Sequence, residues 1–246
     1  MHSMLEMKTP VLVAAFALSL SLAPAQTTLT ADQLAATLAK NLNSGTTEIR
    51  LRMQTQSPAQ ILQLRIKQRW TSNGADAVYE VLFPKERKGE TVFVHQSGGD
   101  TASGSLRTAD GKTKSLRATD ALLDSDLAIA DAVENFYAWP RQSFVGREKV
   151  GNVDCVILES RPAGGAIYGK VRSWIDTQRM VPLRVEKYSA DGSLARRIVT
   201  TRVVPDSGNS IPGDLRVEHA GTHTELDGSR ITHDISFAEG DFTPMR

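Results

Sequence analysis

A repeated alternation of apolar and polar residues runs through most of the chain and constrains its fold more than any other feature. In residues 48–54, and again in 62–67, every second residue is aliphatic or Met. A period of two sends successive side chains to opposite faces of a strand. The pattern therefore predicts half-buried antiparallel strands, each with one apolar face and one solvated face.

Further segments of this kind follow, separated by short turn signals. Strands are expected at 77–83, 91–96, 103–108, 113–118, 142–150, 153–161, 168–176, 182–189, 194–204, 214–220, 222–226 and 230–238. The dipeptides Asp110-Gly111 and Asp227-Gly228 are interpreted as hairpin turns, because Asp-Gly is typical of tight connections between strands.

Two segments carry helical signals instead. Leu34, Leu38 and Leu42 form an apolar stripe at helical spacing, and Thr30 with Gln33 matches a capping box at its start. Residues 121–139 are rich in apolar side chains and are expected to form a helix with one or two helical turns, which Pro140 ends.

Strands do not alternate with helices along this chain, which argues against a parallel, doubly wound sheet. We expect a mainly β (α+β) fold of about ten to twelve strands, in which one antiparallel sheet curls around a helix. No Pro/Ser-rich linker divides the sequence, so residues 26–246 are expected to form one domain.

The N-terminus resembles a secretory signal. An apolar run at 11–22 follows Lys8 and precedes Ala23-Pro24-Ala25. A basic start, a short apolar run and a small-x-small site are typical of a cleavable signal peptide. We therefore predict removal of residues 1–25 and export to the periplasm, with an N-terminal membrane anchor as the alternative.

Charge and cysteine content exclude several classes of function. The formal net charge is +1, and the basic residues are scattered, so nucleic acid is not an expected partner. The one cysteine, Cys155, lies in an apolar run and is interpreted as a buried, unreactive thiol.

Catalytic patterns are not found in the sequence. It contains no Gly-x-Ser-x-Gly elbow, phosphate-binding loop or His-Glu-x-x-His motif. His219, His223 and His233 could meet on adjacent strands as metal ligands or in a hydrolase, but exposed polar strand positions are the favoured interpretation. We expect no enzyme activity, no metal and no cofactor.

Four segments, in order, resemble motifs of the LolA-like outer-membrane lipoprotein-sorting family. They are residues 125–131 (SDLAIAD), 144–159 (FVGREKVGNVDCVILE), 168–176 (YGKVRSWID) and 182–192 (PLRVEKYSADG). The resemblance implies an incomplete β-barrel of the LolA/LolB type, closed by a helical lid over a hydrophobic cavity. Members of this family are taken to be periplasmic carriers of lipoproteins or lipids, or partners of lipid-exporting membrane systems.

These observations lead to a hypothesis of a non-enzymatic carrier that binds acyl chains of a lipoprotein or lipid for transfer toward the outer membrane. Strand parity, used as a guide to the concave face, gives the candidate cavity residues Leu64, Ile66, Val81, Phe83, Phe93, Phe136 and Trp174. The even spacing between Tyr168 and Trp174 predicts that both lie on one face. A helix near 123–136 would cover the cavity.

The partners of such a carrier would be acyl chains together with an inner-membrane exporter or an outer-membrane acceptor. One alternative remains open, because a curved sheet can also enclose a solid core. The protein would then be an interaction module that docks on an envelope or lipid-export complex.

Overall fold

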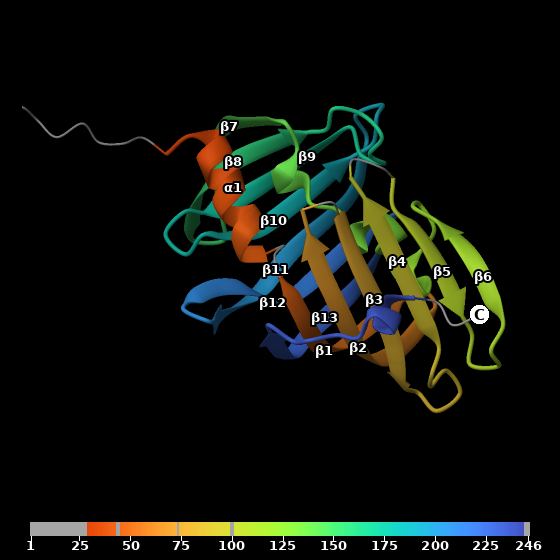
Figure 1. The fold of residues 1–246 in the computed structure, drawn as a ribbon. Coiled ribbons are helices and arrows are strands. Elements are labelled where there is room, and N and C mark those ends of the chain that lie inside the picture. The colour runs from red at the N-terminus through yellow and green to blue at the C-terminus, as the bar shows by residue number, and fades with distance from the viewer. Residues whose placement is uncertain (1–28, 43–44, 73, 99–100, 244–246) are drawn as a thin grey trace, which may run out of the picture.

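One open antiparallel sheet dominates the structure, a computed structural model that describes residues 29–42, 45–72, 74–98 and 101–243. Its thirteen strands follow the order β6-β5-β4-β3-β2-β1-β13-β12-β11-β10-β9-β8-β7 (Figure 1). The two ends of this order, β6 and β7, do not pair with each other, so the barrel is incomplete. The predicted fold class is confirmed. The predicted signal peptide, residues 1–25, lies outside the described residues.

The strands have these bounds: β1 (Thr46–Gln56), β2 (Ala59–Thr71), β3 (Gly74–Phe83), β4 (Thr91–Ser97), β5 (Ser103–Arg107), β6 (Thr113–Arg117), β7 (Arg141–Val150), β8 (Val153–Arg161), β9 (Lys170–Asp176), β10 (Val181–Tyr188), β11 (Leu194–Asp206), β12 (Asn209–His219) and β13 (Thr222–His233). One α-helix, α1 (Ala31–Leu42), precedes them. The 3₁₀ turns are η1 (Leu122–Asp124), η2 (Ile129–Ala132), η3 (Phe136–Ala138) and η4 (Glu239–Phe242). Within the described ranges, no helix is long and apolar enough to cross a membrane.

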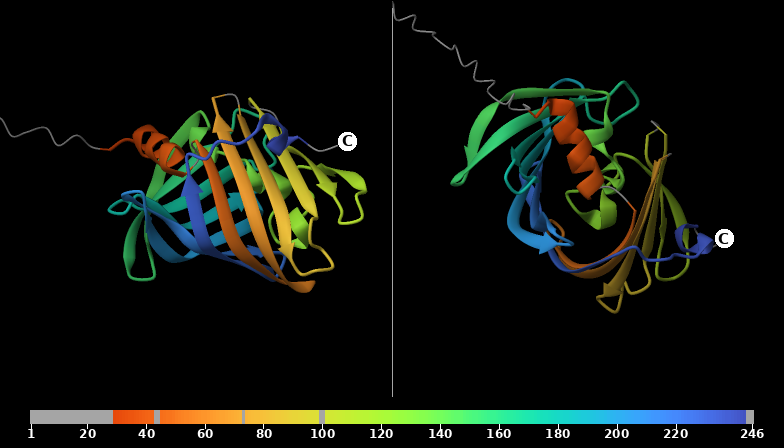
Figure 2. Two further views of the ribbon diagram at one scale, coloured as in Figure 1. Left: turned by 60° about the horizontal axis from the view of Figure 1, so that its bottom comes forward. Right: turned by 60° about the vertical axis from the view of Figure 1, so that its left-hand side comes forward.

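The sheet bends into a horseshoe whose concave side holds α1 and the segment between β6 and β7 (Figure 2). Every pairing is antiparallel, and strands that follow each other in the chain are neighbours in the sheet, except β6 and β7, which form its two free edges. The pair β1–β13 joins the first and last strands of the chain, from Thr47 opposite His233 to Thr55 opposite Thr224. The N- and C-terminal strands therefore meet in the middle of the sheet.

Helix α1 has the predicted start and the predicted apolar stripe. The Thr30 N–H donates to Gln33 Oε1 (2.9 Å), and the Gln33 N–H donates to Thr30 Oγ1 (3.2 Å), which completes a capping box. Leu34 and Leu38 are fully buried, against Leu158 and Tyr137 among others. The helix therefore covers the concave face of β8 and β9.

The predicted helix over residues 121–139 is wrong, because three separate 3₁₀ turns occupy this stretch. Leu123 and Asp124 have positive φ values of 52° and 62°, which no α-helix accommodates. Ser125 Oγ donates to the Leu122 carbonyl (2.6 Å), and Asp131 accepts from the Ala128 N–H (2.7 Å). Such local side-chain bonds to the backbone compete with a helical ladder.

The Asp110-Gly111 hairpin between β5 and β6 is confirmed, whereas the hairpin predicted at Asp227-Gly228 is wrong. These two residues lie within β13, and the turn before that strand is at Ala220-Gly221. A Cβ atom on Gly228 would lie 2.5 Å from the carbonyl oxygen of Gly213. Glycine at this position therefore permits a close backbone approach at an irregular part of the sheet rather than a turn.

Candidate functional site in the interior of the curved sheet

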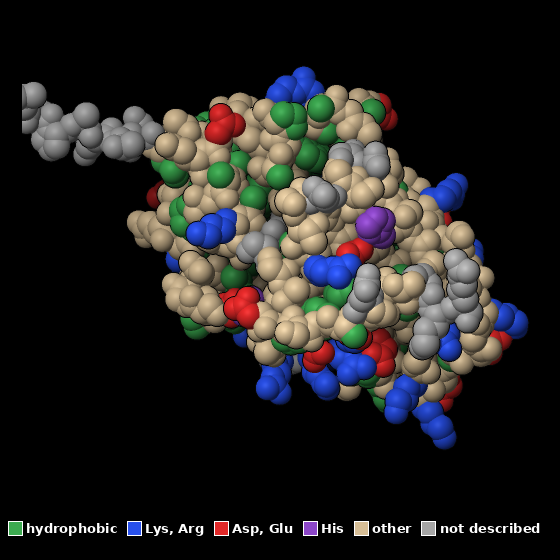
Figure 3. Space-filling view, viewed as in Figure 1, with side chains coloured by type: hydrophobic (Ala, Val, Ile, Leu, Met, Phe, Trp, Pro, Cys, Tyr) green, Lys and Arg blue, Asp and Glu red, His purple; other side chains and the backbone are tan. Residues whose placement is uncertain are grey.

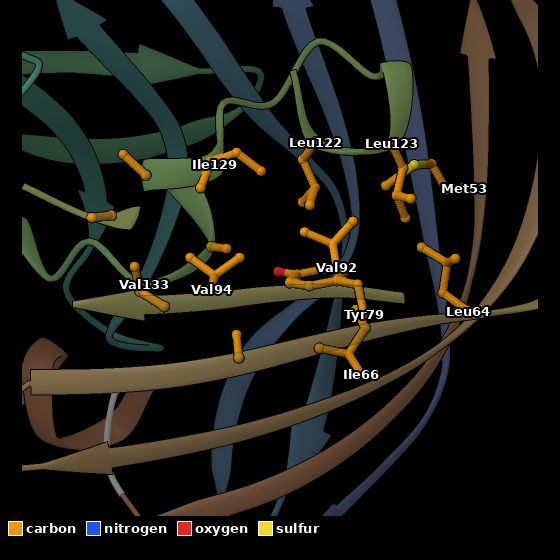
Figure 4. Close-up of a cluster of buried hydrophobic side chains, with 14 of the residues drawn as sticks. Met53, Leu64, Ile66, Tyr79, Val92, Val94, Leu122, Leu123, Ile129 and Val133 are labelled. Carbon is orange, nitrogen blue, oxygen red and sulfur yellow. The ribbon is translucent and has the colours of Figure 1, made fainter. Parts of the chain in front are cut away.

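The concave face of β1 to β4 is apolar, and most of its side chains are buried. Its inward side chains form the largest buried cluster, which includes Met53, Leu62, Leu64, Ile66, Ala75, Ala77, Tyr79, Val81, Val92 and Val94. Figure 4 shows several of these side chains pointing from the strands toward Leu122, Leu123, Ile129 and Val133. Aliphatic side chains on neighbouring strands thus form a continuous apolar wall.

The segment opposite this wall is called the plug here and comprises residues 118–140. Leu122, Ile129 and Val133 of the plug are at most 1 % exposed. The plug thus fills the space that the sheet encloses, and it does so with side chains from loops and 3₁₀ turns. In this structure the plug closes the interior, apart from a cavity at one end.

A buried ionic cluster holds the middle of the plug against β10 and β11. The Asp131 carboxylate accepts from Lys187 Nζ (2.6 Å) and from the Tyr168 hydroxyl (2.9 Å), and Arg196 Nε lies 3.4 Å away. The side chains of Asp131 and Lys187 are only 1 % and 3 % exposed. Burial opposes ionisation of Asp131, but the two nearby cations outweigh it and lower its pKa. The cluster is therefore charged, with its charges paired.

Glu134 is the weakly bonded member of this cluster. Its side chain is 4 % exposed, and the hydrogen bond it accepts from Lys187 Nζ is long, at 3.4 Å. Burial raises the pKa of Glu134 to about 7, an effect that the Lys187 charge only partly offsets. This carboxyl group therefore changes its charge near neutral pH.

Further polar contacts hold the first part of the plug. Thr222 and Thr224 on β13 donate to the Asp126 carboxylate at 2.5 Å and 2.7 Å. Arg196 Nε donates to the Asp126 carbonyl (2.7 Å), and Gln60 Nε2 donates to the Leu123 carbonyl (3.0 Å). The plug is thus fixed by specific polar bonds, while its apolar side chains face the sheet.

A cavity of about 290 Å³ lies at one end of the interior, where the two halves of the horseshoe approach each other. We call it the mouth cavity. It is lined by Trp70, Thr71, Ser72, Gly74, Gln96, Gly98, Val133, Glu134, Asn135, Ala138, Trp139, Pro140, Pro162, Ala163, Gly164 and Ala166. Thr101 Oγ1 donates to the Gly165 carbonyl (2.5 Å) and so links the two halves nearby.

The surface around α1 differs in side-chain type from the lower edge of the molecule in Figure 3. Hydrophobic side chains gather over and around α1, whereas Lys and Arg side chains gather along the lower edge (Figure 3). Ala31, Ala39 and Leu42 of the helix are partly buried against the interior cluster. The apolar interior therefore continues outward beneath α1.

Four of the seven candidate cavity residues lie in the interior. Leu64, Ile66 and Val81 belong to the apolar wall and are 1 %, 3 % and 0 % exposed. Phe136 is partly buried in the interior, where its ring contacts that of Tyr137 at a centroid distance of 4.4 Å. These positions place the four side chains in the interior but do not test whether they bind a ligand.

Phe83 and Phe93 were assigned to the wrong face of the sheet. A bulge beside Leu64 shifts the register, so Phe83 pairs with the exposed Gln63 and is itself 50 % exposed. Phe93 lies between Val92 and Val94, which are buried on the concave face. Because side chains alternate along a strand, Phe93 points to the convex face.

Trp174 was also assigned to the wrong face. It lies on the convex side, where its Nε1 donates to Glu148 (2.9 Å) and the Arg184 guanidinium lies 3.8 Å from the ring centroid. Tyr168 instead points inward to Asp131. The predicted shared face of Tyr168 and Trp174 is wrong because β9 begins only at Lys170, so the alternation does not extend back to Tyr168.

The ionic cluster was not predicted, although the sequence contains a signal for it. Lys187 is in phase with Val185, which lies on the concave face, so a charged side chain occupies an inward position of β10. A buried lysine requires a carboxylate partner. Asp131 falls in the first motif that resembles the lipoprotein-sorting family, but sequence alone does not pair it with Lys187.

The histidines considered as ligands make separate contacts. His219 Nδ1 is 2.8 Å from the Ala195 carbonyl, and His233 Nε2 is 2.6 Å from Asp206. In the described part of the chain, no three His, Cys, Asp or Glu side chains are placed to hold a metal ion. Cys155 is buried, as the sequence predicted.

Solved structures with the same fold cover most of the chain. An outer-membrane lipoprotein-sorting protein domain, so described, from Vibrio parahaemolyticus aligns with a TM-score of 0.76 and 18 % identity, over 87 % of this chain and 96 % of that one. A DUF1329 family protein from Desulfovibrio piger aligns with a TM-score of 0.75 and 18 % identity, over 86 % and 95 %. A LolA superfamily protein from Nitrosomonas europaea aligns with a TM-score of 0.69 and 18 % identity, over 87 % of this chain and 97 % of that one.

Comparison at the sequence level gives one further result. No curated protein matches the chain. A family model with the description "uncharacterized protein" matches residues 75–246, which is more than half of the sequence. The chain therefore belongs to the family that this model describes, and it has the fold of LolA-superfamily and lipoprotein-sorting proteins.

Proposed function

We propose that the protein is a non-enzymatic periplasmic carrier that binds the acyl chains of a lipoprotein or lipid inside its curved sheet, for transfer toward the outer membrane. The observation that carries the proposal is the composition of the interior. An apolar wall on β1 to β4 is covered by a plug that belongs neither to the sheet nor to a regular helix. Such a plug can be replaced by another apolar occupant without breaking the sheet.

The free energies of the two occupants are comparable. Burial of one large aliphatic side chain contributes about 1.5–3 kcal/mol, so Leu122, Leu123, Ile129 and Val133 together contribute about 6–12 kcal/mol. An acyl chain of about 15 methylenes, at about 0.8 kcal/mol each, contributes about 12 kcal/mol. The apolar contributions of plug and acyl chain are therefore similar in size, and the polar bonds of the plug, such as that between Asp131 and Lys187, add to the cost of displacing it.

Three further points support the remaining parts of the proposal. The fold is that of proteins described as lipoprotein-sorting and LolA superfamily. The N-terminal sequence predicts export. The interior polar groups, Asp131 and Lys187, are paired with each other and are thus engaged in holding the plug rather than presented to a substrate.

The proposal is tested by measuring uptake of a fluorescent fatty acid and by native mass spectrometry of protein purified from the periplasm. We expect co-purified lipid and saturable uptake by the wild-type protein. Ile129→Ala removes a plug side chain that is 0 % exposed, so it should ease displacement and tighten binding. Leu183→Ala is the matched control, because Leu183 is buried in a separate cluster with Trp174 on the convex side.

Two outcomes would refute the carrier function. One is the absence of lipid and of uptake in both wild type and Ile129→Ala. The other is an equal change of affinity in Ile129→Ala and Leu183→Ala, which would reflect general destabilisation rather than the plug.

A second candidate function, an interaction module for an envelope or lipid-export complex, is favoured by the edge strand β7. Nearly all of β7 is exposed, including Phe144 and Val145 at 43 % and 44 %. Unpaired edges of this kind are available for pairing with another chain. Retention of a membrane partner by a protein that takes up no lipid would favour this candidate.

A further inference from the structure

The mouth cavity combines features that distinguish it from the apolar wall. It borders that wall, because Val133 lines the cavity and also belongs to the apolar cluster, against which Trp70 packs. Trp70 and Trp139 contribute two indole rings to its lining. An amphiphile with its chain along the wall would therefore place its head group in this cavity.

The charge of the lining selects among head groups. Glu134 is the one charged residue among the described residues that line the cavity. Its neighbour Asn135 also lines the cavity, and the buried Asn135 Oδ1 accepts no hydrogen bond within the described structure. A carboxylate and an unused amide oxygen both need a donor. A phosphate or carboxylate head group would find no cationic partner among these lining residues.

The ionic cluster leaves Glu134 available for such a donor. Lys187 makes its short bond to Asp131 (2.6 Å) and only a long one to Glu134 (3.4 Å). Arg196 and Tyr168 also bond to Asp131, not to Glu134. The remaining bonding capacity of the Glu134 carboxylate is therefore unused in this structure.

We propose that the mouth cavity binds a primary ammonium group, with Glu134 and Asn135 as acceptors and the indoles of Trp70 and Trp139 as neutral walls. Indole faces attract cations, so the two rings favour the same ligand charge as Glu134 does. The proposal rests on the proposed carrier function, since it assigns the head group of the carried amphiphile. An ammonium on a lipid and a free or peptide-borne amine share this chemistry.

The experiment compares three probes by calorimetry at pH 8: dodecylamine, dodecanoate and butylamine. We expect dodecylamine to bind about tenfold more tightly than dodecanoate, which is the contribution of one charge-assisted hydrogen bond. Butylamine should bind weakly, because it lacks the chain. Equal binding of butylamine and dodecylamine would identify a free or peptide-borne amine as the ligand and overturn the lipid assignment.

Two variants and one control test the residues. Glu134→Gln should lose about tenfold in dodecylamine affinity and little in dodecanoate affinity. Glu225→Gln, which removes a half-exposed carboxylate that pairs with Arg216, should change neither. Ala166→Trp fills the cavity from the opposite side and should weaken dodecylamine binding even if Glu134→Gln folds poorly.

The pH dependence gives an independent readout. Because Glu134 is protonated below about pH 7, ammonium binding must displace a proton there and should weaken about tenfold from pH 8 to pH 6. The charged or titratable groups around Glu134 are Lys187, Asp131, Arg196 and Tyr168. The pKa values of Lys187 and Tyr168 are raised and that of Asp131 is lowered, so these three groups keep their charge states over this range.

The outcomes separate the two proposals. If none of the three probes binds at pH 8, the carrier function fails. If dodecanoate binds as tightly as dodecylamine, or if Glu134→Gln leaves dodecylamine affinity unchanged, the carrier function stands and the ammonium site is refuted.

Discussion

Replacement of Asp131 by Asn tests whether the ionic cluster fixes the plug. Asn keeps the shape of the side chain but removes the charge that pairs with Lys187 at 2.6 Å and Arg196 at 3.4 Å. Lys187, 3 % exposed, would then keep Glu134, at 3.4 Å, as its one carboxylate partner. Removal of one partner of a buried ion pair costs about 3–5 kcal/mol, and we expect the lower end because Glu134 can ionise more fully.

The assay is urea unfolding at pH 7, combined with amide hydrogen exchange. A loss of about 3 kcal/mol is a large share of the ~5–15 kcal/mol that holds a typical domain folded. Exchange should accelerate first in the plug, because local opening there no longer breaks the Asp131 bonds. Asp110→Asn is the control, since the Asp110–Lys112 pair is exposed and should contribute nothing measurable.

The sign of the pH dependence follows from the lowered pKa of Asp131. A carboxyl group whose pKa is depressed by folding stabilises the protein above its unfolded pKa, and this stabilisation is lost as the pH falls through the folded pKa. The contribution of the Asp131 carboxylate itself to the difference between wild type and Asp131→Asn should therefore be constant from pH 5 to 8 and shrink in acid. Unfolding free energies within 1 kcal/mol of each other at pH 7 would refute the role of Asp131.

Five other substitutions have defined outcomes. Glu134 has a raised pKa, so the wild type should lose stability as the pH rises from about 4.5 to 7, and Glu134→Gln should remove this slope in urea unfolding at pH 5 and pH 8. Thr30→Ala should cost about 1 kcal/mol and speed exchange in α1, because the capping box is lost. Leu64→Ala should cost about 2–5 kcal/mol and Phe83→Ala less than about 1 kcal/mol in the same assay; equal losses would contradict their assignment to opposite faces. Gly228→Ala should lower the thermal unfolding midpoint, because its Cβ would lie 2.5 Å from the Gly213 carbonyl oxygen; an unchanged midpoint would show that the sheet accommodates the methyl group there.

Local patterns were sufficient where neighbouring residues decide the structure. The alternation in 48–54 and 62–67 predicted β1 and β2, and the capping signals at Thr30 and Gln33 predicted the start of α1. In these segments, periodicity and local hydrogen bonds agree with the tertiary packing. Local patterns gave wrong predictions at two positions. At Phe83 a bulge changes the face to which the side chain points, and at Gly228 glycine is required by close backbone packing rather than by a turn.

The sequence by itself determined that this chain forms an antiparallel sheet, because a period of two needs no knowledge of distant partners. Only the tertiary structure decided what the sheet encloses. Asp131 and Lys187 are 56 residues apart, and their pairing depends on the curvature that brings the plug against β10. The same curvature decides that the interior is closed by residues 118–140, because long-range packing and not local propensity sets the volume inside a bent sheet.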